Sequence, residues 1–303
     1  MISIIIASVD TALLVQIKEN IQATIGVPFE IISFDNSEGE FGLCEVYNRG
    51  AKKAKFDLLC FMHEDIKILT TDWGKIVADI FANNIKLGLI GVAGSQYKSL
   101  APSGWHCYDI DAPEVMYYNV IQNYKYQQKE TIADYSNETD TKLARVVCID
   151  GVWMCCTREA MLSYSFDDVL LKGFHGYDLD FSLGINQTYE VAVTFDVLIE
   201  HFSEGKFNKD WLKEILKIHA KWSKYLPINL SGLDEIKLRK GELKGFKNTF
   251  RRMCREGFKS KEMFALINAS KSSKLMTKSF YISLMSKAIR YALKRLVISS
   301  SGD

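Results

Sequence analysis

The feature that most constrains the fold is an apolar stretch, Phe56–Met62, that ends directly in His63-Glu64-Asp65. An apolar run of this length predicts a buried strand that emerges at the edge of a sheet. In open α/β sheets, ligands bind beyond the carboxyl ends of the strands. Adjacent carboxylates there suit a hard divalent cation, which takes oxygen ligands and in turn holds phosphate. A solvated strand end with ordinary polar caps is the alternative interpretation of this stretch taken alone.

The first ninety residues alternate between strand and helix patterns. Continuous apolar or β-branched runs predict four strands, and apolar residues at helical spacing predict three helices between them. The strands are Ile2–Ala7, Phe29–Phe34, Asp57–Met62 and Leu87–Val92, and the helices are Thr11–Thr24, Leu43–Ala54 and Asp72–Asn83. Strands that alternate with helices indicate an α/β fold with a parallel sheet covered on both faces.

The rest of the chain is less regular and then becomes helical. Residues 95–145 are polar and rich in Tyr, and we expect an irregular insertion with room for a hairpin. Later segments predict short strands and two helices: strands at 146–149, 152–155, 191–195 and 197–201, and helices at 177–187 and 208–224. From Leu233 onward the pattern is helical and basic. We therefore expect two domains, residues 1–225 and a basic helical region at 226–303.

The formal net charge of +1 conceals a polarised chain. Residues 1–204 contain 15 Lys and Arg against 29 Asp and Glu, a net charge of −14, whereas residues 205–303 contain 23 against 8, a net charge of +15. An asymmetry of this size indicates an acidic partner for the basic region: membrane lipid, nucleic acid or the acidic part of the same chain. No recognition motif supports nucleic acid, so we do not expect it as a partner.

The first residues of the chain and the distribution of its cysteines predict a cytoplasmic protein. The apolar start, Met1–Ser8, has no basic residue before it and only the length of a strand, so it does not resemble a signal peptide. No uncharged run approaches the roughly 18 residues that a membrane span needs. The seven Cys show no metal-ligand spacing, and the adjacent Cys155 and Cys156 lie in an apolar stretch, which is typical of buried, reduced thiols.

The C-terminal segment Leu275–Val297 has an apolar stripe surrounded by basic residues. The stripe consists of Phe280, Leu284, Ala288 and Leu296, with Met285, Ile289 and Leu293 beside it. A basic polar face and low net hydrophobicity are typical of a helix that lies in a membrane interface. A helix that packs this stripe on the first domain has the same pattern, and the sequence leaves both interpretations open.

Three further segments place polar side chains at predicted strand or helix ends. Asp35 ends the second strand, where a carboxylate can accept hydrogen bonds from a base or a ribose hydroxyl, or can form a simple turn. Asn48 lies in a helix beside Gly50, and its amide can bind a nucleotide or brace a loop. Asp178 and Asp180 lie in the first turn of a helix, where the helix dipole favours their ionised forms or where they serve as caps.

A metal at His63-Glu64-Asp65 would neutralise the charge that develops on a departing nucleotide diphosphate. Asp65 is the preferred ligand because it lies farthest beyond the strand. His201 ends a late strand and is a further candidate ligand, although a lone histidine is more often structural. An ionised carboxylate such as Asp178 can take a proton from a substrate hydroxyl.

Read in order, these segments resemble the inverting glycosyltransferases of family two over about residues 1–225. This resemblance implies the GT-A fold, an α/β fold with a mostly parallel mixed sheet, followed here by a helical C-terminal region. The segment Asn48–Ala51 is similar to their Asn-x-Gly helix, and His63-Glu64-Asp65 is similar to their Asp-x-Asp metal motif with His in the first position. The segment Phe166–Asp180 resembles their acceptor loop, in which Asp178 matches the catalytic base and Tyr177 replaces a Glu. The segments at 91–95 and 102–105 resemble a bacterial branch of sugar transferases.

This resemblance implies a hexosyltransferase that moves a sugar, with inversion, from a nucleotide diphosphate sugar to an acceptor hydroxyl. It implies Mn²⁺ or Mg²⁺ as cofactor, a saccharide or lipid-linked saccharide as acceptor, and a role in cell-surface polysaccharide synthesis. The implied site has Asp178 as base, Ser8, Asp35, Asn48 and Glu64 at the nucleotide, and Asp65 and His201 at the metal. The basic helices would then bring the enzyme to an anionic membrane as a peripheral protein.

Two other functions remain open from the sequence. A nucleotidyltransferase has a similar fold and metal, but it usually carries a Gly-rich, basic loop after the first strand, and Ser8-Val9-Asp10-Thr11 lacks one. A non-catalytic sugar-nucleotide-binding or membrane scaffold protein of the same fold is the second alternative. In that case His63 and Tyr177 would be substitutions that accompany lost activity, and the basic region would be the surface through which the protein acts.

Overall fold

The computed structural model describes residues 1–107, 109–110, 112–125, 129–205 and 207–300, with side chains as far as Leu293. The chain divides into two compact units, one formed by residues 1–96 and 113–206 and the other by residues 97–112 and 207–303. Each unit is described by itself. This structural division differs from the functional boundary expected after residue 225, which stays a prediction.

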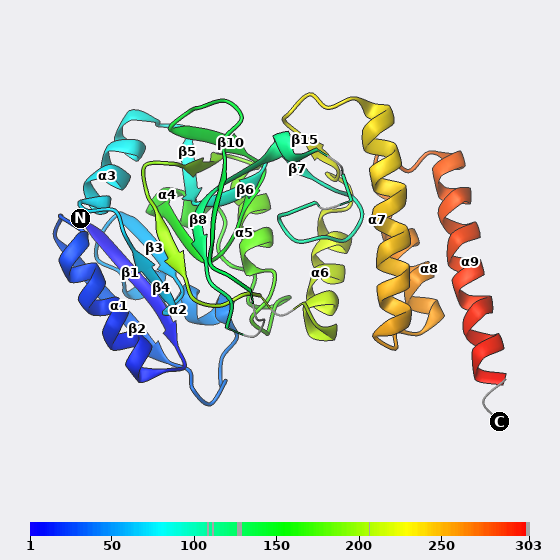
Figure 1. The fold of residues 1–303 in the computed structure, drawn as a ribbon, viewed down its shortest axis with the longest axis horizontal. Helices are drawn as coiled ribbons and strands as arrows, with labels where there is room; N and C mark the ends of the chain where they lie inside the picture. The colour runs from blue at the N-terminus through cyan, green and yellow to red at the C-terminus, as the bar shows by residue number, and fades with distance from the viewer. Residues whose placement is uncertain (108, 111, 126–128, 206, 301–303) are drawn as a thin grey trace. The chain divides into compact units, whose positions relative to one another are not determined.

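The first unit is built on a sheet of seven strands (Figure 1). In spatial order these are β10 (Leu143–Val146), β13 (Glu190–Thr194), β5 (Leu87–Gly91), β12 (Trp153–Thr157), β3 (Leu58–Met62), β1 (Ile2–Ser8) and β2 (Phe29–Asp35). Strand β1 pairs in parallel with both β2 and β3, whereas β12 runs antiparallel to β3 and β5. The four strands predicted in the first ninety residues are confirmed to within a residue or two at each end, and the sheet is mixed, as expected.

Helices cover both faces of this sheet because side chains alternate along each strand. The helices of this unit are α1 (Thr11–Thr24), α2 (Leu43–Lys53), α3 (Trp73–Asn83), α4 (Arg158–Ser163) and α5 (Tyr177–Ile185). On one face Ile4 belongs to a buried core with Ile17 of α1 and Val77 of α3. On the other face Ile5 lies against Gly50 of α2, where a Cβ would come within 2.3 Å of it. Close approach of helix to strand therefore accounts for this helical glycine.

The expected irregular insertion contains ordered strands. Strands β8 (Met116–Gln122) and β9 (Ile132–Ser136) form the anticipated hairpin. A second sheet runs in the order β11 (Cys148–Ile149), β6 (Ala93–Ser95), β8, β14 (Ile199–His201) and β4 (Ile66–Ile68). The strand expected at 146–149 is divided: Leu143–Val146 joins the first sheet and Cys148–Ile149 joins the second. The short 3₁₀ helix Pro113–Val115 precedes β8.

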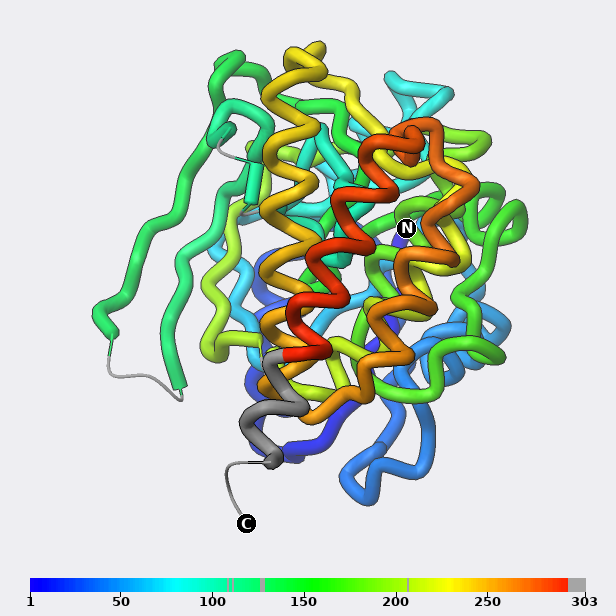
Figure 2. The backbone as a smooth tube through the Cα atoms, turned by 90° about the vertical axis from the view of Figure 1, so that its right-hand side faces the viewer, coloured from blue at the N-terminus to red at the C-terminus, as the bar shows by residue number. Residues whose placement is uncertain are grey.

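The second unit is mainly helical, as expected from Leu233 onward. Its elements are the two-stranded pair β7 (Tyr97–Lys98) and β15 (Ile228–Asn229) and the helices α6 (Lys209–Trp222), α7 (Glu235–Arg255), α8 (Ser260–Ala269), the 3₁₀ turn Ser270–Ser272 and α9 (Lys278–Ser300). Figure 2 shows α7, α8 and α9 side by side, and α9 contacts both of the others. The side chain of Asn208 caps α6 by accepting a hydrogen bond from the Trp211 amide.

The apolar stripe predicted on the last helix is largely buried within this unit. Phe280, Leu284 and Ala288 are 1 % exposed or less, and the Phe280 ring lies 6.2 Å from the ring of Phe246 on α7. Within this unit, α9 packs against α7 and α8. Leu296 lies outside the residues whose side chains are described. A second stripe on α9, formed by Ile282, Ile289 and Leu293, is exposed.

All seven cysteines carry free thiols, and six of them are buried. Burial raises the pKa of Cys155 and Cys156 well above that of an exposed thiol, so both remain protonated. The expectation of buried thiols is confirmed for six of the seven, whereas Cys254 is partly exposed, and their reduced state stays a prediction. Within the described part of the chain, no helix combines the length and the hydropathy that a membrane crossing requires.

Candidate active site

The carboxyl ends of β1, β2 and β3 bring several predicted residues to one edge of the first sheet. Ser8 and Asp35 are partners in the parallel register of β1 and β2. Ser8 is 4 % exposed, whereas Asp35 is exposed and accepts a hydrogen bond from the Ser37 amide at 3.0 Å. This turn lowers the pKa of Asp35 chiefly through the backbone hydrogen bond from Ser37. The Asp35 carboxylate is therefore ionised at the open end of the strand.

Glu64 fastens the loop that follows β1. Its Oε1 accepts hydrogen bonds from the amides of Val9 and Asp10, at 2.9 and 3.0 Å. Asp10 in turn caps α1 by accepting from the amides of Ala12 and Leu13. The Oε2 atom of Glu64 is buried and has no hydrogen-bond partner among the described residues. Glu64 thus shapes the loop beside Ser8 and retains one unused acceptor atom.

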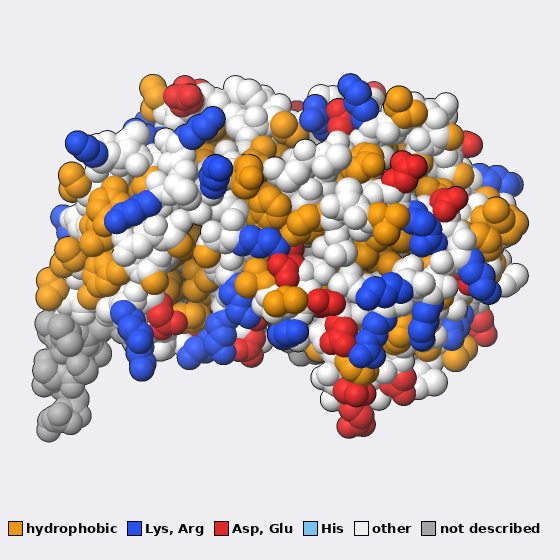
Figure 3. Space-filling view, turned by 180° about the vertical axis from the view of Figure 1, so that it is seen from behind, with side chains coloured by type: hydrophobic (Ala, Val, Ile, Leu, Met, Phe, Trp, Pro, Cys, Tyr) orange, Lys and Arg blue, Asp and Glu red, His pale blue; other side chains and the backbone are white. Residues whose placement is uncertain are grey.

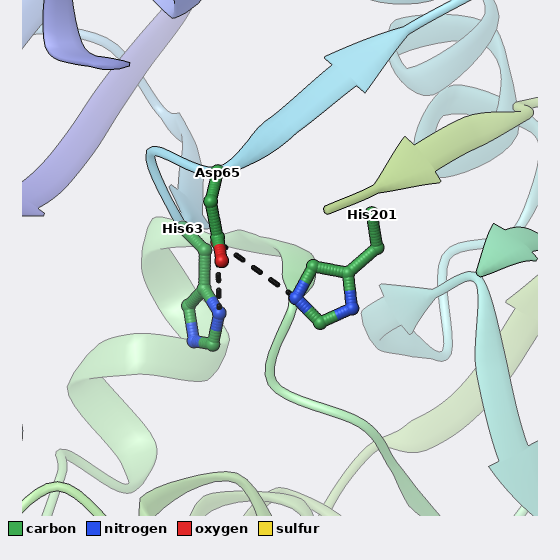
Figure 4. Close-up of side chains that lie close together, drawn as sticks. All are labelled: His63, Asp65 and His201. Carbon is green, nitrogen blue, oxygen red and sulfur yellow. Dashed lines mark ion pairs between the residues drawn. The ribbon is translucent and has the colours of Figure 1, made fainter. Parts of the chain in front are cut away.

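Asp65 and His201, the two predicted metal ligands, lie together, and His63 joins them (Figure 4). The Asp65 Oδ1 atom lies 3.8 Å from Nδ1 of His63 and 3.7 Å from Nε2 of His201. One donor atom from each side chain lies within 4.8 Å of the other two. His201 arrives there because β14 pairs antiparallel with β4, in a register that places His201 opposite Ile66. Strand pairing therefore joins residues far apart in the sequence.

Neighbouring side chains orient two members of this cluster. The Ser203 hydroxyl donates to Oδ2 of Asp65 at 2.6 Å and leaves Oδ1 facing the imidazoles. The amide nitrogen of Gln122 donates to the Ser203 carbonyl, so its Oε1, 3.1 Å from Nδ1 of His201, acts as an acceptor. His201 must then carry its proton on Nδ1. Its Nε2 lone pair consequently faces Asp65.

His63 is oriented by a tyrosine from the start of α5. Its Nε2 lies 2.8 Å from the hydroxyl of Tyr177, and its Nδ1 faces Asp65. Tyr177 is 6 % exposed, and burial raises its pKa well above the ordinary value, so it stays a neutral hydroxyl. The sequence interpretation treated His63 only as a departure from the metal motif. The structure places it in the cluster.

The electrostatics of the cluster favour an ionised Asp65 carboxylate and a neutral His201 ring. Burial opposes ionisation of Asp65, but the imidazoles of His63 and His201 and the Ser203 hydroxyl together lower its pKa. Burial, with a smaller contribution from His63, lowers the pKa of His201. A neutral imidazole and an ionised carboxylate are the forms that bind metal ions.

Asn48 braces the segment that resembles an acceptor loop. Its amide nitrogen donates to the Phe166 carbonyl at 2.8 Å and to Oδ2 of Asp168 at 2.9 Å. The Gly173 carbonyl accepts from the Leu43 amide, so α2 holds this loop at two points. The Oδ1 atom of Asn48 is buried without a partner among the described residues. The structure thus shows the loop-bracing contact, and the nucleotide contact stays a prediction.

The two carboxylates at the start of α5 have different surroundings. Asp180 is fully buried, and its Oδ2 accepts a hydrogen bond from the Tyr164 hydroxyl at 2.8 Å. Asp178 is partly buried, and burial, followed by the charge of Asp150, raises its pKa to about 7. Gly176 precedes them with φ of 80°, the left-handed conformation that glycine tolerates best. Asp178 therefore has the properties of a general base near neutral pH, and Asp180 those of a structural residue.

Several residues of the site were missed by sequence reasoning. Asp150, in the turn before β12, affects the pKa of both Asp178 and His201. The sequence indicated only a break between strands at Asp150-Gly151. Ser203 stands two residues after His201, which was an available signal. Gln122 lies in the region expected to be irregular and gave none.

The donor set fits a divalent cation. Metal–ligand bonds of about 2.0–2.2 Å hold adjacent ligands roughly 3 to 3.5 Å apart, so a small contraction of the observed spacings completes three bonds. Two imidazole nitrogens and a carboxylate oxygen suit Mn²⁺, Co²⁺ or Zn²⁺. The side chains of His63, Asp65 and His201 are partly exposed, at 35 %, 21 % and 14 %. His63, Asp65 and His201 are the residues that would hold the cation.

Several solved structures have a similar fold at low sequence identity. S. aureus TarS is 11 % identical with a TM-score of 0.52, over 96 % of this chain and 54 % of that one. Its 1–349 fragment in complex with UDP-GlcNAc is 12 % identical with a TM-score of 0.50, over 96 % of this chain and 89 % of that one. GalNAc-T7 with UDP, GalNAc and Mn²⁺ is 10 % identical with a TM-score of 0.50, over 74 % of this chain and 49 % of that one.

These matches confirm the predicted GT-A fold, and the chain spans only about half the length of GalNAc-T7 and of the longer TarS chain. No curated protein matches the chain in sequence. The model of the family described as "Glycosyltransferase like family" matches residues 3–225, which is most of the chain. That span includes β1, the cation cluster, Asp178 and His201. The chain therefore belongs to the glycosyltransferase-like family.

Proposed function

We propose that this protein is an inverting glycosyltransferase of the family-two type, with residues 1–225 as its catalytic domain. It moves a hexose from a nucleotide diphosphate sugar to an acceptor hydroxyl with the help of Mn²⁺ or Mg²⁺. The acceptor class that fits the sequence resemblance is a saccharide or lipid-linked saccharide of a bacterial surface polysaccharide. The free, buried thiols favour a reducing compartment, in accord with the expected cytoplasmic location.

The observation that carries this proposal is the meeting of Asp65, His201 and His63 beyond the end of β3. Asp65 lies in the bend between β3 and β4 and His201 ends β14, and the pairing of β14 with β4 brings the two residues together. The same unit holds Asp178, whose pKa burial raises to about 7. The proposed sugar transfer requires two features: a cation site for the diphosphate and a carboxylate that can exchange a proton near neutral pH.

In the mechanism, Ser8, Asp35, Asn48 and Glu64 form the nucleotide subsite at the ends of β1, β2 and β3 and on α2. Asp178 accepts the proton of the acceptor hydroxyl as its oxygen forms a bond to the anomeric carbon. The bond from that carbon to the diphosphate oxygen breaks on the opposite side, which inverts the configuration. A cation bound at His63, Asp65 and His201 supplies positive charge for the departing diphosphate.

The first experiment is a thermal-shift panel of UDP, GDP, dTDP and CMP, each with and without Mn²⁺. A ligand present at 100 times its Kd adds about 2.7 kcal/mol of stability, which moves a melting curve visibly. We expect one nucleoside diphosphate to stabilise the protein only with Mn²⁺, and Asp65→Asn to abolish that effect. Stabilisation by no nucleotide would overturn the proposal and favour the non-catalytic scaffold.

We also propose that α9 brings the enzyme to an anionic membrane surface. Its exposed stripe consists of Ile282, Ile289 and Leu293, which are 65 %, 46 % and 56 % exposed. Lys278 and Arg290 are exposed on the same helix, and residues 263–302 contain seven Lys and Arg and no Asp or Glu. In Figure 3, hydrophobic side chains gather over α9 above the grey end of the chain. Apolar side chains flanked by cations match the interface of an anionic bilayer.

Flotation of the full chain with vesicles tests this location. We expect binding to phosphatidylglycerol vesicles that is stronger than binding to phosphatidylcholine vesicles and that falls as salt is raised. The double variant Ile282→Ser, Ile289→Ser should weaken it. Ile85→Ser is the matched control, because Ile85 is 89 % exposed on the first unit. Equal flotation of both variants would show that α9 does not bind the membrane.

A further inference from the structure

His63 and Tyr177, the two positions at which this chain departs from the motifs of the family-two glycosyltransferases that it resembles, contact each other. His63 stands where the metal motif has its first Asp, and Tyr177 stands where the acceptor loop has a Glu before the base. The His63 Nε2 and the Tyr177 hydroxyl oxygen lie 2.8 Å apart, although 114 positions separate the residues in sequence. Two substitutions that look independent in the sequence therefore form one hydrogen-bonded pair.

The position of the Tyr177 hydroxyl is fixed by its surroundings. The Tyr177 ring packs edge-on against Tyr47, with ring centroids 5.6 Å apart, and Tyr47 is fully buried. A Cβ atom at Gly151 would lie 2.2 Å from the hydroxyl oxygen. Any side chain at position 151 would displace the hydroxyl. The backbone at Gly151 thus leaves the space that the hydroxyl fills.

This contact determines which nitrogen of His63 is available. With Nε2 engaged by Tyr177, Nδ1 faces Oδ1 of Asp65. When Nδ1 holds a cation, the single proton of the neutral ring resides on Nε2 and is donated to the Tyr177 oxygen. His201 has the equivalent arrangement, with its Nδ1–H donated to Gln122 and its Nε2 facing Asp65. Histidine ligands in metal sites are commonly oriented in this way by an acceptor on the second nitrogen.

We propose that Tyr177 is a positioning residue that holds His63 as an Nδ1 ligand, so that the site selects cations that accept nitrogen ligands, such as Mn²⁺ and Co²⁺, over Mg²⁺. The inference rests on the cation site of the proposed function. Mg²⁺ favours oxygen ligands, whereas imidazole suits the transition metals. Because Tyr177 precedes Asp178, the same hydrogen bond also ties the start of α5 to the cation site.

The test measures binding of Mn²⁺, Co²⁺ and Mg²⁺, each alone, to the full chain. Tyr177→Phe keeps the buried ring and removes the hydroxyl. We expect this substitution to weaken the binding of Mn²⁺ and Co²⁺ about 10- to 100-fold, which is the usual loss of affinity when the hydrogen-bond partner of a ligating histidine is removed. The visible absorption of bound Co²⁺ should change as well, because one nitrogen is no longer held in place. Mg²⁺ binding, which depends mainly on the Asp65 carboxylate, should change little.

Tyr164→Phe is the matched control, because it removes a hydroxyl that bonds to Asp180, a residue on the same helix as Tyr177. It should bind all three ions as the wild type does. Gly151→Ala keeps the Tyr177 hydroxyl but displaces it, and should reproduce the loss seen in Tyr177→Phe. His63→Asp should raise the preference for Mg²⁺ relative to Mn²⁺. Unchanged Mn²⁺ binding in Tyr177→Phe, or a wild type that binds none of the ions, would overturn the inference.

Failure of this inference can be told apart from failure of the proposed function. If Tyr177→Phe loses Mn²⁺ but no nucleotide stabilises the wild type with Mn²⁺, the positioning role stands and the glycosyltransferase proposal fails. If nucleotide binding requires Mn²⁺ but Tyr177→Phe binds the ion normally, the reverse holds. Both readouts are equilibrium binding measurements and do not depend on the unknown acceptor.

Discussion

Each of the two units contains a cluster of histidine and charged side chains, and the two clusters are built in opposite ways. In the first unit, one potential ligand atom each from His63, Asp65 and His201 lies within 4.8 Å of the other two, and the Ser203 hydroxyl donates to Oδ2 of Asp65. In the second unit, a buried lysine, Lys98, supplies the positive charge. Under the proposed function, the first cluster would take a cation from solution, whereas the second contains its own positive charge in Lys98.

The second cluster satisfies its polar atoms internally. The Lys98 ammonium donates to the carbonyls of Ser103 and Gly104 and to Nε2 of His219, at 3.0, 3.2 and 3.0 Å. Burial, followed by the charge of Lys98, lowers the pKa of His219, so that ring is neutral and its Nδ1–H donates to the Leu100 carbonyl. The segment at 97–112 is thereby held to α6. This cluster is buried and its polar groups are hydrogen-bonded to one another, so it is structural. Both clusters contain histidine and a charged side chain, but only the second contains a hydrogen-bond donor, the Lys98 ammonium, at its centre.

The largest expected effect is on stability, at Glu242 of α7, which belongs to the second cluster because it interacts electrostatically with Lys98. This fully buried carboxylate accepts hydrogen bonds from the Tyr97 hydroxyl and from the amides of Leu100 and Ala101, at 2.6, 2.8 and 2.7 Å. Glu242→Ala leaves these donors unpaired and should cost about 3–5 kcal/mol in the free energy of unfolding. Chemical denaturation measures the loss, and hydrogen exchange should show it at the Leu100 and Ala101 amides.

A surface carboxylate provides the control for Glu242. Glu45 forms an exposed ion pair with Arg49 one turn away, and Glu45→Ala should change stability by no more than about 0.5 kcal/mol. If Glu242→Ala were as mild as Glu45→Ala, the second cluster would not be a structural one. The residues around Glu242 would then be candidates for a binding site, and the two clusters would no longer differ in role.

The next effect is on catalysis, at Asp178. Asp178→Asn removes the group that accepts the acceptor proton, and we expect the rate of sugar transfer to fall about 10²- to 10⁴-fold. The thermal shift caused by nucleotide and Mn²⁺ should persist, because Asp178 is not a cation ligand. Asp180→Asn should instead lower stability, since the Asp180 carboxylate is buried against Tyr164. Full transfer activity in Asp178→Asn would assign the base elsewhere.

A smaller effect is expected at Asp65, on cation-dependent stability alone. The wild type should gain about 2.7 kcal/mol at Mn²⁺ concentrations of 100 times the Kd, and Asp65→Asn should lose that gain. Without Mn²⁺ the variant should melt close to the wild type, because Asp65 is only partly buried and the Asn side chain still accepts from Ser203. A variant that unfolds without metal would make this cluster structural, like the one around Lys98.

The sequence predicted the sheet more fully than the site. Continuous apolar runs and helical spacing depend on local burial, so β1, α1, β2, α2 and β3 were predicted almost to the residue. Asp65 and His201 were predicted because each follows a strand. Their contact, however, depends on the pairing of β14 with β4, which no local pattern specifies.

Residues that act through a second side chain were the hardest to predict. Tyr177 and His63 were interpreted separately as departures from a motif, because a hydrogen bond between residues far apart in the chain cannot be recognised from the spacing of residues in the sequence. The stripe on α9 shows the same limit. Periodicity identified an apolar face, but the split between a buried face at Leu284 and an exposed one at Ile289 depends on where α7 and α8 pack.

The smallest predicted effect is a shift in pH dependence caused by Asp150. Burial raises the pKa of Asp178 to about 7, and the charge of Asp150 is the next cause. Because Asp178 acts in its ionised form, transfer should rise with pH through this pKa. Asp150→Asn removes the charge but keeps an oxygen acceptor for the Val152 amide. The acidic limb of the rate profile should therefore move to lower pH.

The same substitution should also alter the pH dependence of folding. Between pH 3.8, the ordinary pKa of an aspartate, and about pH 7, the folded protein holds the Asp178 proton and the unfolded chain does not, so this group's contribution to stability falls as pH rises. Asp150→Asn should flatten that fall. The rate profile is best measured at saturating Mn²⁺, because Asp150 also raises the pKa of His201. An acidic limb that stays in place would show that burial alone sets the pKa of the base, and that the turn before β12 belongs to the scaffold, not to the site.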